Sequence, residues 1–408
     1  MIELLNKSIS VILPEFLDKN HLEELHSIFN TILVNKPDAH IDGLLNSELR
    51  IEDSFNFRLQ VDTLITFSQN RIDRDKFLVL LLYLSRAAII NGEHLVAVDI
   101  NEKIIALTAN DKDLINLCAN AFLSIGDIYS RQSNWQKSIE YINSASELFS
   151  SVNDLKGVAS CENLLGTIYG DLGDINKAIE NFESALEKSN DDQNYLLKGK
   201  IEINLGIVNS IIGSFDEALV FFKRALLNFE KIGDKNRLAE IHQNIGMVYA
   251  RKGDFTSAIK QFDESLALSF EINYLQNIGI AYLNKSYVFS QIGDYALATA
   301  FTNKAMEIAH KLNDKLTMAE VYKIKGIIER NLKSYTTAEN YFITSLRLNK
   351  ESGNQLNEAE TNRELGLLFK ETGKTLEAKE CFNAALIFFK KVNSIPDVVA
   401  VENLLSPK

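Results

Sequence analysis

Glycines recur along this chain at intervals of forty residues, and this period limits the possible folds more than any other feature. A fixed spacing kept over many copies is typical of a repeat array rather than of a single globular core. We therefore predict one structural unit that is repeated seven times in register. The series is Gly126, Gly166, Gly206, Gly246, Gly326 and Gly366, and Ser286 stands at its one exception.

Other columns of residues keep the same period. In one unit, Gly246 is followed by a second glycine at Gly253, an aromatic at Phe255, a small residue at Ala258 and a bulky one at Phe262. The apolar residues between these columns have helical spacing, which predicts two amphipathic helices in each unit. A helix pair cannot bury its apolar face alone, so the pairs are expected to stack into a solenoid.

The glycines are interpreted as packing and turn residues. Gly246 lies inside the first helix, where glycine costs about 1 kcal/mol relative to alanine, so a close approach of the neighbouring helix best explains it. Gly253 falls at the end of that helix, where a left-handed cap favours glycine. A phosphate-binding loop needs a different spacing between a strand and a helix, and that alternative is rejected.

The prolines agree with an all-helical fold. The chain of 408 residues has only four, at Pro14, Pro37, Pro396 and Pro407, so no helix breaker lies between Asp38 and Ile395.

Taken together, the columns resemble the tetratricopeptide repeat. The unit is longer than usual and lacks the common proline at the end of the second helix, and in both respects it is similar to the repeats of the kinesin light chain and of Pins/LGN-type adaptors. The resemblance implies an all-α, right-handed α-solenoid with an N-terminal helical segment. Its seven expected repeats are 114–153, 154–193, 194–233, 234–273, 274–313, 314–353 and 354–393.

The two ends lack the full pattern. Residues 1–78 are expected to form an N-terminal helical cap or small helical domain, with a helix over Val11 to Leu33 and Pro14 near its start. Residues 79–113 are interpreted as a degenerate repeat, and residues 394–408 as a capping half-repeat. A helix-turn-helix DNA reader at the N-terminus is the alternative, but no basic recognition helix stands out.

Composition excludes several classes of function. The net charge of −12 argues against nucleic acid or an anionic membrane as partner. The apolar run from Phe77 to Leu84 is too short to cross a bilayer, and three widely spaced cysteines suggest a reducing, cytoplasmic location. No catalytic group, metal site or cofactor site is expected: His21 and His26 are interpreted as surface residues, and the cysteines as core thiols.

A binding face is predicted from the helical period. Phe262 marks the side of the second helix that packs against the first helix of the same unit. The opposite face of that first helix then carries Asn244, Met247 and Arg251. Asn204, Asn244 and Asn284 then form a ladder, and the resemblance implies that such residues hold the backbone of a bound peptide. Apolar residues at Ile207, Met247, Tyr287, Ile327 and Leu367 would form an exposed floor. The remaining candidates are Lys200, Gln291, Asn331, Glu360 and Glu364.

These features predict a non-enzymatic interaction module that binds a peptide segment of a protein partner in a concave groove. Glu320, Glu360, Glu364 and Glu371 would make one end of that groove acidic, which favours a partner with a basic segment. The alternative is a regulatory sensor or peptide-signal receptor of a bacterial signalling system. An enzymatic function would need residues 1–75, which carry no motif for it.

Overall fold

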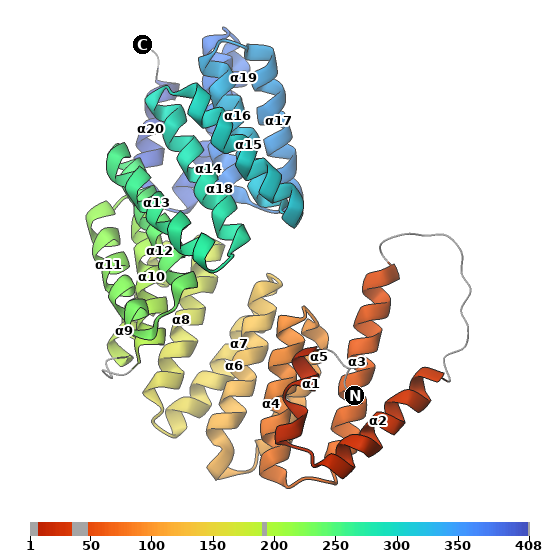
Figure 1. Ribbon diagram of the computed structural model, residues 1–408. Coiled ribbons are helices and arrows are strands. Elements are labelled where there is room, and N and C mark those ends of the chain that lie inside the picture. The colour runs from red at the N-terminus through yellow and green to blue at the C-terminus, as the bar shows by residue number, and fades with distance from the viewer. Residues whose placement is uncertain (1–6, 35–47, 190–193, 407–408) are drawn as a thin grey trace. The chain divides into compact units, whose positions relative to one another are not determined.

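The computed structural model describes residues 7–34, 48–189 and 194–406, and every regular element within these ranges is a helix (Figure 1). The all-α prediction is thus confirmed for these residues. The chain forms two compact units, Met1–Leu164 and Leu165–Lys408.

Helices that follow one another in the chain pack in pairs, as expected for a solenoid. The first unit contains α1 (Lys7–Ser10), the 3₁₀ turn η1 (Leu13–Glu15), α2 (Lys19–Val34), α3 (Glu48–Ser68), α4 (Arg74–Ile90), α5 (His94–Thr108), the 3₁₀ turn η2 (Lys112–Leu114), α6 (Ile115–Arg131) and α7 (Trp135–Ser151). The boundary between the units falls within α8 (Leu155–Leu172). The second unit continues with α9 (Ile175–Lys188), α10 (Tyr195–Ile212), α11 (Phe215–Ile232), α12 (Lys235–Arg251), α13 (Phe255–Glu271), α14 (Leu275–Ile292), α15 (Tyr295–Leu312), α16 (Lys315–Asn331), α17 (Tyr335–Glu351), α18 (Gln355–Glu371), α19 (Thr375–Lys391) and α20 (Ile395–Leu405).

Short polar turns set where these helices start and stop. At the end of α11, Gly233 adopts a left-handed φ of 73°, a conformation that glycine reaches without a steric penalty. The next residue, Asp234, caps α12 by accepting a hydrogen bond from the Arg237 backbone N–H at 3.1 Å. Gly253 and Asp254 repeat this arrangement between α12 and α13. The hydrogen bond from Ser257 lowers the pKa of the Asp254 carboxyl, as expected of an ionised cap.

The glycine column lets the two helices of a pair approach closely, as the sequence predicts. A Cβ placed on Gly166 of α8 would lie 2.6 Å from Cε1 of Phe182 on α9, well inside van der Waals contact. Gly326 and Phe342 meet in the same way at 2.6 Å. The aromatic ring therefore occupies the space that a side chain on the first helix would need.

In the repeat with Ser286 in place of glycine, the two helices of the pair contact each other through different side chains. Its partner on α15 is Thr302 rather than phenylalanine, and both side chains are fully buried. The Ser286 hydroxyl lies 3.0 Å from the Ala298 carbonyl oxygen and is hydrogen-bonded to the Thr302 hydroxyl. A hydroxyl pair thus replaces the glycine–phenylalanine pair.

In the first unit, α4 and α5 share one apolar core with the elements before them. Phe77, Leu80, Leu81 and Leu84 of α4 are buried there, which confirms that the apolar run belongs to a core helix. Among the described residues, no helix is long and apolar enough to span a membrane. The pair α4–α5 begins at Arg74, five residues before the boundary expected at residue 79.

The N-terminal segment differs from expectation in one respect. A single helix over Val11 to Leu33 is wrong, because Pro14 lies in the 3₁₀ turn η1 and α2 begins only at Lys19. The chain restarts there because the Asp18 carboxylate accepts a hydrogen bond from the His21 backbone N–H at 2.9 Å. The part of the expected N-terminal segment at residues 1–6 and 35–47 lies outside the described residues.

Candidate functional site

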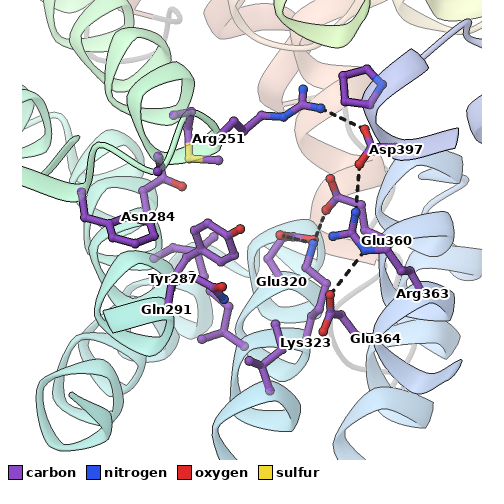
Figure 2. A pocket seen from close by; sticks show the side chains of 18 of the residues that line it. Arg251, Asn284, Tyr287, Gln291, Glu320, Lys323, Glu360, Arg363, Glu364 and Asp397 are labelled. Atoms are coloured by element: carbon purple, nitrogen blue, oxygen red, sulfur yellow. Dashed lines mark hydrogen bonds and ion pairs between the residues drawn. The ribbon is translucent and has the colours of Figure 1, made fainter. Parts of the chain in front are cut away.

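The second unit contains a cavity of about 430 Å³ formed by the first helices of successive pairs (Figure 2). Helices α12, α14, α16 and α18 supply most of its wall. Pro396 and Asp397, at the start of α20, close another side. The site is therefore assembled from helices that are far apart in the sequence.

The structure brings many of the sequence-predicted residues into this cavity, but not all of them. Those that line it are Met247, Arg251, Asn284, Tyr287, Gln291, Ile327, Glu360 and Glu364. Those that do not are Lys200, Asn204, Ile207, Asn244, Asn331 and Leu367. The members in the cavity come from α12 to α18, so the predicted stripe converges only in this part of the array.

The three asparagines of the predicted ladder do not act together at this cavity. Only Asn284 lines it, and its amide donates a hydrogen bond to Oε1 of Gln243 at 3.1 Å. Gln243 in turn donates to the backbone carbonyl of Asn277 at 3.0 Å. Asn284 is therefore positioned by a buried polar network between α12 and α14.

The predicted apolar floor is exposed only in part. Ile207 is 39% exposed, whereas Met247 and Tyr287 are half-buried and pack against a core cluster. The expectation is wrong for Ile327, which is only 3% exposed because the helices of neighbouring pairs cover it. Leu367 likewise packs against the core formed by α17 to α20.

The prediction that one end of the groove is acidic is wrong as well, since the carboxylates there form ion pairs within the protein. Lys323 contacts Glu320 at 2.9 Å and also forms an ion pair with Glu360. Arg330 contacts Glu364 at 2.9 Å. Glu371 lies 3.6 Å from Nε of Arg330. These ion pairs neutralise most of the negative charge that the sequence analysis expected to face a partner.

Burial and charge act in opposite directions within this network. Burial raises the pKa of Glu320, and its Oε1 atom is buried without a hydrogen-bond partner. Burial also opposes ionisation of Glu360, but the attraction of Lys323 and Arg363 is larger and lowers the pKa of that carboxyl. Burial disfavours the charge on Lys323, yet Glu320 and Glu360 outweigh it and raise the pKa of the ammonium. Lys323 is thus held as a cation.

The wall formed by α20 is held by two arginines on opposite sides of the cavity. Nη2 of Arg251 lies 2.9 Å from Oδ2 of Asp397, and Nη1 of Arg363 lies 2.9 Å from Oδ1 of the same carboxylate (Figure 2). Ser394 adds a hydrogen bond to Oδ2 at 2.6 Å. Asp397 is therefore fixed by one arginine from each of two other helices, α12 and α18, and by Ser394 at the start of its own helix.

Sequence reasoning missed Lys323, Arg363 and Asp397 as site residues. The first two had a detectable signal, because each basic residue lies three positions after an acidic one, Glu320 or Glu360, on the same helix face. Asp397 had none, since its position depends on how the helices stack over the whole unit.

The described residues offer little for catalysis. No group of three or more His, Cys, Asp or Glu side chains among them could hold a metal ion. Burial raises the pKa of Cys161 to about 12 and that of Cys381 to about 11, so both stay protonated thiols near neutral pH. Nδ1 of His242 lies 2.8 Å from Oε1 of Gln261, which makes it a structural contact between α12 and α13.

Comparison with known proteins bears on the repeat units themselves. A model of the tetratricopeptide repeat matches residues 117–190 and 198–269. These residues are tetratricopeptide repeats. A search of curated proteins finds no match to this chain.

Solved structures of tetratricopeptide-repeat proteins share the fold at low sequence identity. A Rap protein complexed with competence and sporulation factor has a TM-score of 0.62 and 15% identity, covering 84% of this chain and 96% of its own. Aspartyl phosphate phosphatase F from Bacillus subtilis has a TM-score of 0.59 and 14% identity, covering 88% and 97%. The Rap conjugation gene regulator of plasmid pLS20, in complex with the Phr* peptide, has a TM-score of 0.57 and 16% identity, covering 93% and 97%. At these identities the likeness concerns the fold alone.

Proposed function

We propose that this tetratricopeptide-repeat protein is a non-enzymatic interaction module that binds a peptide segment of a partner at the cavity between α12 and α20. The observation that carries the proposal is the convergence of four first helices on one cavity. Its wall combines apolar groups, such as Met247 and Ile324, with hydrogen-bonding groups at Asn284 and Gln291. This combination of apolar surface and a few placed polar groups is typical of binding sites.

Two of the structural neighbours were solved in complex, one with competence and sporulation factor and one with the Phr* peptide, which supports a binding role of the fold here. Another neighbour is named a phosphatase. We favour a non-enzymatic role because the charged groups that line this cavity, including Lys323 and Glu360, neutralise one another. Faster release of phosphate from acetyl phosphate than in buffer alone would contradict that part of the proposal. A cytoplasmic location stays a prediction from the three unpaired thiols.

The proposal is tested by selecting peptides and then changing the cavity. Displayed random peptides are selected on the wild-type chain, and the affinity of an enriched peptide is measured by fluorescence anisotropy. We expect Asn284→Ala and Gln291→Ala to weaken binding about tenfold, which corresponds to about 1.4 kcal/mol. Asn340→Ala is the matched control, because Asn340 is exposed on the second helix α17.

The same peptide separates the cavity from the predicted ladder. If the cavity is the site, Asn204→Ala and Asn244→Ala bind as the wild type does, since neither residue lines it. A ladder that holds the peptide backbone instead requires all three asparagines. Failure to enrich any peptide, or full affinity in Asn284→Ala and Gln291→Ala, would contradict the proposed site.

The second candidate function is a regulatory sensor for a short peptide. The contacts of Asp397 with both α12 and α18 favour it, because a ligand that enters between these helices changes how they are held together. Small-angle scattering with the selected peptide tests this: a sensor shows a change in the radius of gyration on binding, whereas a rigid adaptor does not.

A further inference from the structure

The two arginines that hold Asp397 have the geometry of a prepared carboxylate-binding site. Arg251 also donates to the Ser210 carbonyl at 2.7 Å and lies over the Phe215 ring at 5.1 Å. Arg363 is oriented by Glu364, whose Oε1 is 3.4 Å from its Nε. Both guanidinium groups thus make further contacts besides those with Asp397.

The segment that carries Asp397 fits closely against remote turns of the same unit. A Cβ on Gly213, at the end of α10, would lie 2.8 Å from Cδ of Pro396. A Cβ on Gly173 would lie 3.1 Å from Cε of Lys391 and 3.5 Å from Cγ1 of Val392. The junction of α19 and α20 therefore packs on the turns that follow α8 and α10, and it closes the cavity from that side.

With α20 in this position, Pro396 and Asp397 take up one side of the cavity. Its volume of about 430 Å³ lies in the lower part of the range for small-molecule sites, about 300–1,000 Å³. A peptide that contacts both Arg251 and Arg363 in place of Asp397 requires the start of α20 to move away. Such a movement removes Asp397 from Arg251 and Arg363, whose side chains are 26% and 23% exposed.

We propose that Arg251 and Arg363 form a carboxylate-binding site, that Asp397 occupies it within the chain, and that a peptide partner displaces Asp397 with an acidic group of its own. The inference rests on the proposed function, because it concerns the same cavity. A partner without a carboxylate would remove the 2.9 Å ion pair of Arg251 and would leave Arg363 only its 3.4 Å contact with Glu364, an acid that also pairs with Arg330. The partner is therefore acidic at this point, in contrast to the basic segment that the sequence suggested.

The chain itself supplies the probe for a test. A fluorescent peptide with the sequence of residues 394–405, SIPDVVAVENLL, is compared with the same peptide carrying Asn in place of its Asp. In the wild-type chain the attached α20 competes at a high effective concentration, so we expect weak binding of both peptides. In the full-length Asp397→Asn variant we expect the Asp peptide to bind at least tenfold more tightly than it binds the wild type, and tenfold more tightly than the Asn peptide binds the same variant.

A matched control lies on the same helix. Glu402 forms an exposed ion pair with Lys390 at 2.8 Å, so Glu402→Gln removes the same charge without touching the cavity. We expect this variant to bind both peptides as the wild type does. Adding Arg363→Met to Asp397→Asn should abolish the preference for the Asp peptide. The circular dichroism spectrum and melting curve of each variant show whether it is folded.

Hydrogen exchange measures the release of α20 directly in the full chain. The amides of α20 should exchange at least tenfold faster in Asp397→Asn than in Glu402→Gln. The proposal is overturned if the amides of α20 exchange in Asp397→Asn at the wild-type rate. It is also overturned if that variant binds the two peptides equally or binds neither. If selected peptides bind the wild-type chain but no Asp preference is found, this inference fails while the proposed function stands. If the Asp peptide binds Asp397→Asn but no peptide can be selected on the wild type, the carboxylate site and its occupation by Asp397 stand, whereas displacement by a partner and the proposed function fail.

Discussion

Replacing Gly166 by alanine tests the packing that generates the repeat. The new Cβ would lie 2.6 Å from Cε1, 2.7 Å from Cδ1 and 3.0 Å from Cζ of Phe182, whose side chain is only 2% exposed. Overpacking of this kind costs about 1–3 kcal/mol. Alanine favours a helix interior over glycine by about 0.5–1 kcal/mol, which offsets part of that cost. We expect Gly166→Ala to destabilise the protein by about 1–2 kcal/mol.

The control lies one turn further along the same helix. A Cβ on Gly170 would meet only Cβ of Ala178 at 4.0 Å, so Gly170→Ala gains helix propensity without a clash. We expect it to stabilise the protein by about 0.4–1 kcal/mol. Both variants are measured by urea unfolding followed by far-ultraviolet circular dichroism, and hydrogen exchange of α8 and α9 locates the effect.

A second substitution shows whether the ring of Phe182 is the cause. Phe182→Leu alone should cost stability, because it leaves a cavity. In the Gly166→Ala background the same change should restore stability, because it makes room for the new methyl group. A shift in the same direction for Gly166→Ala and Gly170→Ala, or additive effects of Gly166→Ala and Phe182→Leu, would refute the packing argument.

Two further predictions concern buried charge. Arg330→Met should destabilise the protein by about 1.5–3 kcal/mol, because the buried Glu364 carboxylate loses its 2.9 Å partner and keeps only Arg363 at 3.4 Å. The exposed pair of Arg347 serves as control, and Arg347→Met should cost about 0.5 kcal/mol or less in urea unfolding. Burial raises the pKa of Glu202, although a hydrogen bond from Asn228 at 2.7 Å opposes the shift. The folded state therefore favours the protonated acid, and wild-type stability falls as the pH rises from the ordinary glutamate pKa of about 4.3 through the raised value. Glu202→Gln removes this loss, so its stability should exceed that of the wild type near pH 7 and the difference should vanish below about pH 4; an unchanged difference across that range would contradict the assignment.

Local features of this protein were predictable from the sequence because they repeat. The contact of Gly166 with Phe182 depends on one helix pair, and the same two columns recur in other units. The exchange to Ser286 and Thr302 was visible in the same columns, although the hydroxyl pair that they form was not. Asn284 and Tyr287 were found for a similar reason, since the free stripe of a helix follows from its buried one.

The charge balance of the site was not predictable from the same periodicity. Glu320 and Glu360 were recognised, but their pairing with Lys323 depends on the distance between α16 and α18. The contact of Arg251 with Asp397 is even harder to predict from the sequence, because it joins residues 146 positions apart. Its formation depends on small rotations that accumulate from one helix pair to the next.

That contact also bears on how the second unit folds. In an array whose helices touch only their neighbours, stability is a sum of local terms and unfolding starts by fraying at a terminal helix. The ion pair between Arg251 and Asp397 adds a stabilising interaction between helices that are not neighbours in the sequence. The terminal helix α20 therefore cannot fray without breaking this pair. Closing a loop of this length carries an entropy cost that grows with the logarithm of its length. We expect this ion pair to form late in folding, once the intervening helices have stacked. We also expect it to make the unfolding of α12 to α20 a single cooperative step.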